Sequence, residues 1–482
     1  MKLESVTIKN YRSIEEISFN ISQLDDNTFT YGLIGVNEAG KSTILKALAL
    51  KDGLKNEKGE KLPLSKDFKD KAKDIEIEYI YLLEKEERQG AKDILISETT
   101  DIVVDNIDLS IAKYITSFNI SAPSETLESV EIINVNDEND KKAIIEEKLR
   151  VFISKKTHES IFWTAEDRYL ISQPINLSQF ATDPENISIP LKNCFALAGI
   201  NGKEEIQKKV GLIIESTERE QLKTELSEKV SEHINKAWPK HPIKITFDIS
   251  DGLINFHVHD EGAKGKAKTA DQRSDGFKQF VSFLLTISAQ SRNGELSNSI
   301  LLLDEPETHL HPQAQEDLLK ELIKITDNQR NNIVFFATHS NYMIDKDDLS
   351  RNYKIFKNPN KKTEKEKTEK EQFDKKASTY AGVTYQVFDI ASTDYHNELY
   401  SKLHETYQDA DLSDEKRCGI LNFDTNFFAN EKKLEKDKPW KGKVKQATLP
   451  TYIRNCIHHS DNGDKYKDDD LRKSIELMLS YL

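Results

Sequence analysis

Cysteine is scarce in this 482-residue chain, and its three copies, Cys194, Cys418 and Cys456, lie far apart without metal-ligand spacing. We therefore expect reduced, structural thiols rather than a disulfide framework or a zinc site. No apolar run approaches the roughly 18 residues of a membrane span. The start, MKLESVTIKNYRSIEEISF, also lacks the apolar core of a secretory signal. These absences predict a cytoplasmic protein with no membrane partner.

An excess of positive charge is missing as well. The net charge is -14, which argues against a protein that coats nucleic acid over its whole surface. A local basic groove is still compatible with that charge, and solubility explains the acidic excess better. Charged residues make up 32% of the chain and hydrophobic ones 37%, as in a polar globular protein. A chain of this length favours two or three lobes over a single core, and it contains no internal repeats.

Strand and helix patterns indicate how the lobes follow one another. Residues 1–20 are typical of a strand, a turn and a second strand, 29–35 of a short apolar strand, and 41–51 of a helix. An Asp-Gly turn signal joins two alternating runs in 243–260. Later, the apolar strands SILLLDE and NIVFFATHS alternate with helices near 274–288 and 312–326. This alternation predicts a parallel sheet covered on both faces.

The predicted fold class is therefore α/β. A charged run at 361–376, KKTEKEKTEKEQFDKK, favours a solvated helix or a disordered linker over a binding element. We divide the chain into the N-terminal part of a nucleotide-binding head (1–84), a mainly helical insertion with some head strands (85–242), the C-terminal part of the head (243–352), a charged linker (353–378) and a mainly helical C-terminal lobe (379–482).

The stretch GVNEAGKST, which follows the strand at 29–35, matches G-x-x-x-x-G-K-[ST] and opens a helix. Successive backbone N–H groups of such a loop point inward and cradle phosphate oxygens. Lys41 would reach the β- and γ-phosphates, and the Ser42 hydroxyl would ligate Mg²⁺. The candidate ATP-binding residues of this loop are Gly35, Asn37, Gly40, Lys41, Ser42 and Thr43.

The run LLLDEPETHLHP supplies the complementary half of an ATP site. Its strand ends in Asp304, which places a carboxylate near the metal, and Glu305 is positioned to polarise the attacking water. His339 follows the strand FFATHS and could hydrogen-bond a γ-phosphate, although a structural histidine at a strand end is the alternative. In QRSDGFKQF, Ser274 and Gly276 could offer a hydroxyl and backbone amides to a γ-phosphate, or form an ordinary helix cap.

Four motifs follow one another along the chain: GVNEAGKST, QRSDGFKQF, LLLDEPETHLHP and FFATHS. Together they resemble the ABC-type ATPase heads of the SMC, RecF and OLD group, over about residues 1–350 apart from the insertion. The resemblance implies an ABC-type P-loop head, with ATP and Mg²⁺ as cofactors. It also implies that two heads sandwich ATP, with the signature stretch Ser274–Gly276 of one copy facing the P-loop of the other. A homodimer or higher homo-oligomer would follow. The glutamine-bearing loop of the family is not located in this sequence.

Within that group, DEPETHLHP looks like the form found in OLD-type and antiphage-defence ATPases. The stretches NISIPLKNCFALAGI (186–200), RSDGFKQF and YHNELY (395–400) look similar to Septu-type PtuA ATPases, some of which occur with retrons. This resemblance implies a sensor or regulator of bacterial antiphage defence, with a separate HNH nuclease subunit (PtuB-like) and, in some systems, a retron reverse transcriptase and its msDNA. The TOPRIM nuclease domain of OLD enzymes has no convincing counterpart after residue 350.

The C-terminal stretch YIRNCIHH (452–459) could be either a ribonuclease site or a structural or partner-docking element. Arg454 and His458 would share a helix face, with His459 about 100° further round. Arg454 and His459 resemble the R-x4-6-H signature of HEPN ribonucleases, which implies metal-free cleavage of RNA such as tRNA, with Glu398 as a further acid or base. A structural or partner-docking role is favoured, because this pattern recurs by chance. The third functional hypothesis is a DNA repair ATPase of RecF or SMC kind. Such a protein would need a coiled-coil arm or a basic DNA-binding face, and the insertion shows neither sustained heptads nor a strong basic bias.

Overall fold

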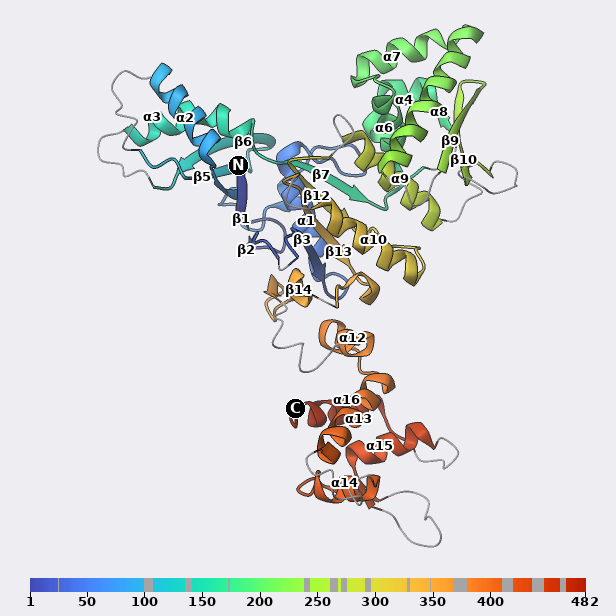
Figure 1. The fold of residues 1–482 in the computed structure, drawn as a ribbon. Helices are drawn as coiled ribbons and strands as arrows, with labels where there is room; N and C mark the ends of the chain where they lie inside the picture. Colours follow the sequence, from blue (N-terminus) through green and yellow to red (C-terminus); the bar gives the residue numbers. More distant parts are fainter. Residues whose placement is uncertain are drawn as a thin grey trace. The chain divides into compact units, whose positions relative to one another are not determined.

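The structure is a computed structural model that describes residues 1–24, 26–98, 107–134, 141–171, 174–237, 243–260, 268–269, 275–290, 296–326, 330–346, 348–367, 379–409, 419–435, 446–459 and 465–482. The chain forms two compact units. The first, which we call the ATPase unit, comprises Met1–Asp345 and Arg351–Lys367, and the second, the C-terminal unit, comprises Lys346–Ser350 and residues 368–482. Figure 1 shows the elements of each unit, coloured along the sequence.

A six-stranded sheet forms the centre of the ATPase unit, with the strand order β15-β14-β3-β13-β12-β7. The strands from β14 to β7 are parallel to their neighbours, and β15 is antiparallel to β14. The predicted parallel sheet is therefore confirmed. The bounds are Thr30–Ile34 for β3, Glu159–Thr164 for β7, Ser299–Asp304 for β12, Ile333–Thr338 for β13, Asn352–Lys357 for β14 and Thr363–Lys367 for β15.

Both faces of this sheet are covered, which explains why its central strands are continuous apolar runs. Leu302 of β12 packs in one core cluster together with the buried face of α1 (Lys41–Ala49). The neighbouring Leu301 points to the opposite face and packs in another cluster with α10 (Pro312–Ile325). Alternating side chains of one strand thus hold a helix on each side, as successive strand residues must.

A second, antiparallel sheet has the order β2-β1-β4-β5-β6. Its strand β1 is the predicted N-terminal strand, and the turn that follows it leads into β2. Helices α2 and α3 pack together, and α3 lies against β6 (Figure 1). The bounds are Lys2–Lys9 for β1, Glu16–Asn20 for β2, Ile75–Leu82 for β4, Ile111–Asn119 for β5, Ala122–Ile132 for β6, Lys85–Glu98 for α2 and Lys141–Ser154 for α3.

A third sheet contains the predicted hairpin β9–β10 together with β8 and β11, and a group of helices packs around it. The long helix α8 packs along β9, and α9 packs against α6 and α8. Figure 1 shows α8 beside this hairpin. The bounds are Ile175–Asn176 for β8, Leu177–Thr182 for α4, Pro184–Ile187 for α5, Ile189–Leu197 for α6, Gly202–Leu212 for α7, Ser216–Ala237 for α8, Ile243–Ser250 for β9, Leu253–Asp260 for β10, Lys268–Thr269 for β11 and Asp275–Gln290 for α9.

The described part of the C-terminal unit is mainly helical around its own core. Buried side chains from four of its helices meet there, among them Leu399, Phe423, Ile453 and Ile475. The bounds are Tyr380–Phe388 for α12, Thr393–Asp409 for α13, Ile420–Asn426 for α14, Leu449–His458 for α15, Asp468–Leu479 for α16, Lys433–Glu435 for β16 and Gln446–Thr448 for β17.

The expected charged linker at 353–378 is wrong in its first part. Residues 353–367 belong to β14, a turn and β15 of the central sheet, and 368–378 lie outside the described residues. Tyr353 and Ile355 are buried, which fixes β14 against β3. Strand β15 is an edge strand with alternating Lys and Glu. Charged side chains are common on edge strands because they oppose pairing with other chains, so the charged composition did not exclude a strand.

Two further expectations concern membrane spans and thiols. Among the helices in the described ranges, none combines the length and the apolar composition that crossing a bilayer requires. Cys194 and Cys456 are buried and form no disulfide among the described residues, as expected for structural cysteines. Cys418 lies outside the described residues.

Candidate functional site

The loop between β3 and α1 is shaped by glycines. Gly40 precedes α1 with φ 110°, and a Cβ there would lie 2.4 Å from Thr363 Oγ1, so both backbone angle and space exclude a side chain. Gly35 has φ 152°, and its Cβ would lie 2.3 Å from the carbonyl oxygen of Ile355. Because α1 begins at Lys41, its first N–H groups have no helical acceptor and are available to a phosphate.

Lys41 is held inside this loop. Its Nζ donates to the carbonyl oxygens of Gly35 (2.8 Å) and Val36 (3.0 Å) and lies 3.2 Å from both ring nitrogens of His339. The residue is only 4% exposed. Burial lowers the pKa of Lys41 to about 8, although the nearby carboxylates, Glu305 foremost, oppose the shift. A partly desolvated ammonium at a helix N-terminus is well suited to bind a polyphosphate.

Ser42 and Asp304 form the candidate magnesium site. The Ser42 hydroxyl donates to Asp304 Oδ1 at 2.7 Å. Asp304 is the last residue of β12, and burial raises the pKa of its carboxyl group while the Ser42 hydrogen bond lowers it. A hydroxyl and a carboxylate at this separation fit Mg²⁺, which takes few protein oxygens and completes its shell with water and phosphate oxygens. When bound between these residues, the ion would neutralise phosphate charge.

Glu305 and His339 face each other at the ends of neighbouring parallel strands. His339 Nε2 lies 2.7 Å from Glu305 Oε1. Glu305 has φ 53°, and its backbone N–H donates to the carbonyl of Ala337 at 3.0 Å, which ties the end of β12 to β13. The carboxyl edge of a parallel sheet is where ligands of α/β proteins bind. A carboxylate there can accept a proton from water, and the imidazole can donate a hydrogen bond to a phosphate oxygen.

These side chains surround one cavity of about 480 Å³. Asp304 joins the group through Ser42, and Gly35 lies at the start of the loop. The structure thus brings the predicted residues of the two nucleotide motifs and of the histidine strand together. The residues that line the cavity are Asn37, Glu38, Gly40, Lys41, Ser42, Thr43, Glu305, His339 and Lys357.

The predicted signature stretch lies elsewhere in the unit. Gly276 is buried in the first turn of α9, where a Cβ would lie 2.4 Å from the carbonyl oxygen of His309. The start of α9 therefore packs closely on the loop that follows Glu305. Gly276 is not among the residues that line the cavity around Lys41. Ser274 lies outside the described residues.

Sequence reasoning missed Glu307, which is buried directly beneath the site. Its Oε1 accepts hydrogen bonds from the Thr338 hydroxyl and from the His339 N–H (3.4 Å). Its Oε2 has no partner among the described residues. Burial raises the pKa of Glu307 to about 7, and its hydrogen bond from Thr338 opposes the shift. Its place two residues after Glu305, in the same loop, was the signal available in the sequence.

Lys357 was missed as well, because no motif marks it. It is the last residue of β14 and lies inside the stretch expected to be a linker. Since β14 runs parallel to β3, its C-terminal end reaches the edge of the sheet that carries the P-loop. Only the pairing of these two strands reveals that Lys357 lines the nucleotide cavity.

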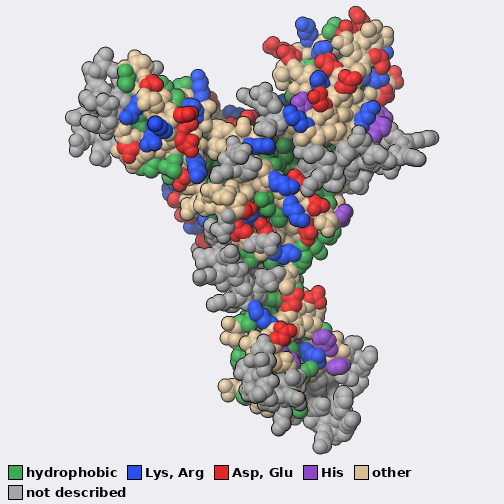
Figure 2. Space-filling model, in the orientation of Figure 1, with side chains coloured by type: hydrophobic (Ala, Val, Ile, Leu, Met, Phe, Trp, Pro, Cys, Tyr) green, Lys and Arg blue, Asp and Glu red, His purple; other side chains and the backbone are tan. Residues whose placement is uncertain are grey.

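The C-terminal candidates lie in the other unit. Arg454 and His458 belong to α15, and His459 is its C-cap residue. The Arg454 guanidinium donates to Asn455 Oδ1 at 3.1 Å. Burial and then the charge of Arg454 lower the pKa of His458. The two residues are four positions apart in α15 and therefore share a helix face. Both histidines are exposed, and Figure 2 shows histidine and basic side chains together on the visible face of this unit.

Glu398 is engaged in a different contact. Its carboxylate accepts a hydrogen bond from the Thr379 hydroxyl. Thr379 is the N-cap residue of α12, and the same hydroxyl accepts from the N–H of Gly382 at 3.2 Å. This hydrogen bonding supports the start of α12 and gives Glu398 a structural role. Its assignment as an acid or base therefore has no support from its contacts.

Comparison with known proteins gives one family. Residues 1–344 match the family described as the AAA ATPase domain. An uncharacterized protein of Methanocaldococcus jannaschii is 28% identical over 126 residues, which is 25% of this chain and 32% of that protein. The chain thus matches about a third of that relative's length.

The solved structures similar to this chain include SMC heads. One is an SMC head bound to the C-winged helix domain of ScpA, with a TM-score of 0.44, 13% identity and coverage of 77% of this chain and 99% of that one. Another is the SMC head domain with an extended coiled coil from Pyrococcus furiosus, bound to the C-terminal domain of ScpA. It has a TM-score of 0.41 and 12% identity, and the match covers 77% of this chain and 98% of that one. A third is the SMC head domain from Thermotoga maritima, with a TM-score of 0.37, 11% identity and coverage of 77% of this chain and 100% of that one.

Proposed function

The chain belongs to the AAA ATPase domain family, and we propose that it binds and hydrolyses ATP as the sensor or regulatory subunit of a bacterial antiphage defence system. In this role it controls a partner nuclease of the HNH type. The observation that carries the ATPase assignment is the convergence of Lys41, the Ser42–Asp304 pair and the Glu305–His339 pair at one cavity. The defence role rests on two similarities. DEPETHLHP resembles the form found in OLD-type and antiphage-defence ATPases, and NISIPLKNCFALAGI, RSDGFKQF and YHNELY resemble Septu-type PtuA ATPases.

The chemistry follows from where each group lies. Lys41 and the N–H groups of α1 offset the charge of the β- and γ-phosphates. Glu305 accepts a proton from the attacking water, and His339, held by Glu305, donates a hydrogen bond to the γ-phosphate oxygen on which charge develops. Burial of Lys41 strengthens its attraction for phosphate because less water screens the charge.

Two copies of the chain complete each ATP site in this proposal. Gly276 packs against the loop after Glu305 and does not line the cavity around Lys41. The resemblance to ABC-type heads implies that the signature stretch of one copy faces the P-loop of the other. The assembly is then a homodimer or a higher homo-oligomer that closes around ATP and Mg²⁺, and nucleotide occupancy becomes a signal that the nuclease can read.

The C-terminal unit supplies the docking surface for the nuclease, and where a retron is present, for its reverse transcriptase and msDNA. His458 and His459 are exposed beside Arg454, which suits contact with a partner. The test is co-purification of the HNH nuclease with the full chain and with a chain that ends at residue 378. We expect the nuclease to be lost on truncation. A truncated chain that retains the nuclease would exclude docking by this unit.

A second candidate function is ATP-regulated cleavage of RNA by the C-terminal unit itself. It is favoured by the shared helix face of Arg454 and His458 in α15 and by the exposure of His458 and His459 at the end of that helix. In this case the substrate is tRNA, the Arg454 guanidinium holds the scissile phosphate and His459 transfers the proton. Radiolabelled tRNA incubated with the protein alone is cleaved, and Arg454→Ala abolishes the cleavage. Cleavage that survives this substitution removes the site.

A further inference from the structure

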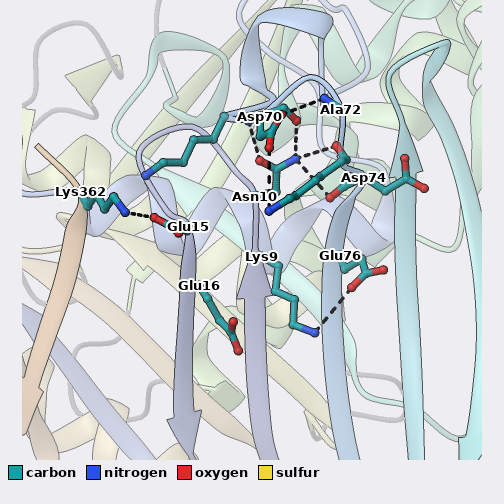
Figure 3. Close-up of a pocket in the computed structure, with 11 residues that line it drawn as sticks. Lys9, Asn10, Glu15, Glu16, Asp70, Ala72, Asp74, Glu76 and Lys362 are labelled. Carbon is teal, nitrogen blue, oxygen red and sulfur yellow. Dashed lines mark hydrogen bonds and ion pairs between the residues drawn. The ribbon is translucent and has the colours of Figure 1, made fainter. Parts of the chain in front are cut away.

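The turn between β14 and β15 (residues 358–362) is anchored beside the nucleotide loop. Strand β14 pairs in parallel with β3, and β15 pairs back onto β14. At the far side of the turn, Lys362 forms an ion pair with Glu15 of the segment leading into β2, at the rim of a separate cavity of about 840 Å³. Figure 3 shows this pair. The hairpin is therefore attached to the ATPase unit at both ends of its turn.

Thr363, the first residue of β15, connects the hairpin to the P-loop. Its hydroxyl donates to the carbonyl of Ala39 at 3.3 Å and lies 2.8 Å from the Ser13 hydroxyl. Its backbone N–H donates to the carbonyl of Ser13 at 3.1 Å. The closeness of this side chain to Gly40 leaves no room for a Cβ there. The P-loop turn is thus packed directly on the hairpin, and the hairpin occupies a defined position relative to the phosphate cradle.

Lys357 extends from this hairpin into the nucleotide cavity. Its Nζ donates to Thr363 Oγ1 at 2.6 Å. Among the described residues no carboxylate lies within ion-pair distance of it, in contrast to Lys362. Lys357 is exposed, and partial desolvation of its ammonium, followed by the charge of Lys69, lowers its pKa. Its ammonium is therefore a cation without an anionic partner, facing the same space as Lys41, where an arriving anion is favoured.

We propose that Lys357 is a second nucleotide-binding lysine, which contacts the phosphate chain of ATP together with Lys41. The inference deepens the proposed ATP site and rests on it. The ligand is a nucleoside polyphosphate rather than a nucleoside, because the contact is between an ammonium and phosphate oxygens. The Thr363 hydroxyl holds the Lys357 side chain near the cavity, so little side-chain entropy is lost when the phosphate contact forms.

The test measures equilibrium binding to the full chain with Mg²⁺ present. The probes are a non-hydrolysable ATP analogue, ADP and adenosine. We expect Lys357→Met to weaken binding of the ATP analogue by about tenfold or more, and to leave adenosine binding unchanged. Lys357→Arg keeps the charge and should restore most of the affinity. Lys361→Met changes an exposed lysine of the same turn that does not line the cavity, and should bind as the wild type does.

The outcomes separate this inference from the ATP site itself. Lys41→Met is the reference variant and should lose the ATP analogue. If Lys41→Met loses it while Lys357→Met binds within about twofold of the wild type, the site stands and the role of Lys357 is refuted. If both variants bind normally, the proposed ATP site is also refuted. If Lys357→Met binds both the ATP analogue and adenosine more weakly by the same factor, the proposed phosphate contact is refuted. Thermal melts of Lys357→Met and Lys357→Arg, measured beside the wild type, identify a variant that does not fold.

Discussion

Around Lys41, the ATPase unit gathers charged side chains from the ends of four parallel strands, whereas Arg454, His458 and His459 in the C-terminal unit follow one another along a single helix. In the first case residues remote in the sequence meet only because the sheet is ordered β14-β3-β13-β12. In the second case the helix period alone makes two of them neighbours. Convergence from distant segments is therefore much stronger evidence for a functional site than proximity within one helix.

Burial separates the two groups in the same way. Lys41 is 4% exposed and Glu307 also 4%, and a charged or polar group is kept inside a protein only where other groups compensate its desolvation. His458 and His459 are exposed and carry no such cost. The C-terminal unit does bury one histidine, His396, whose Nε2 lies 2.9 Å from Ser474 Oγ, but this contact lies between α13 and α16 and is explained by helix packing.

The largest effect that the comparison predicts is on catalysis. Glu305→Gln removes the group that accepts a proton from water, so ATP turnover should fall by at least about 100-fold. Nucleotide binding should survive, because the phosphate cradle is unchanged. The matched control is Glu204→Gln, an exposed carboxylate of α7. Steady-state phosphate release and nucleotide binding check both statements, and turnover at the wild-type rate in Glu305→Gln would remove its assigned role.

The next effect concerns stability and distinguishes buried from exposed ion pairs. Arg351 is 1% exposed in the ATPase unit and pairs with Asp345 and Asp26 at 2.8 and 2.7 Å. Arg351→Met removes the hydrogen bonds of this buried guanidinium to two carboxylates that are 16% and 39% exposed. Because hydrogen bonds to charged groups contribute about 1.5–3 kcal/mol each, the loss should cost about 3 kcal/mol. In the C-terminal unit, Arg472 pairs with Asp389 at the surface, and Arg472→Met should leave the unfolding midpoint unchanged. Calorimetric melts of both variants measure the contrast, and similar shifts would contradict it.

A smaller effect, of opposite sign in the two units, should appear with pH. In the ATPase unit, folding raises the pKa of Glu307 from 4.5 to about 7. The folded state therefore keeps a proton that the unfolded state has lost, and this contribution to stability is present below pH 4.5 and lost as the pH rises to about 7. Unfolding free energies of wild type and Glu307→Gln should thus diverge by up to about 3 kcal/mol across this window. A constant difference would show that Glu307 does not titrate there.

In the C-terminal unit, burial lowers the pKa of His396 from 6.5 to about 4, with a further contribution from His458. The unfolded state then takes up a proton first on acidification, so stability is present above pH 6.5 and lost as the pH falls towards about 4. His396→Asn should weaken this acid dependence, measured by denaturant unfolding of the full chain at several pH values. The same acid dependence in the variant would assign it to other groups.

Much of the ATP site could be predicted from the sequence because each of its motifs consists of consecutive residues. Gly35 to Thr43 form the phosphate loop from consecutive residues, and Asp304 and Glu305 follow one another at a strand end. The helices near 41–51, 274–288 and 312–326 and the hairpin within 243–260 were predictable from periodicity for the same local reason. The strands β14 and β15 were not, because alternating Lys and Glu is compatible with both a linker and an edge strand, and only pairing with β3 decides.

By itself, the sequence determined the chemistry of the phosphate loop and the α/β class, since consecutive N–H groups and apolar strand runs are local properties of the chain. The tertiary structure alone decided that Glu307 is buried beneath His339 and that Lys357 reaches the cavity of Lys41. Both depend on which strands are neighbours in the central sheet, where β13 separates β3 from β12 and β14 lies on the other side of β3. Such an order is set by the packing of residues hundreds of positions apart, and no short stretch of sequence contains it.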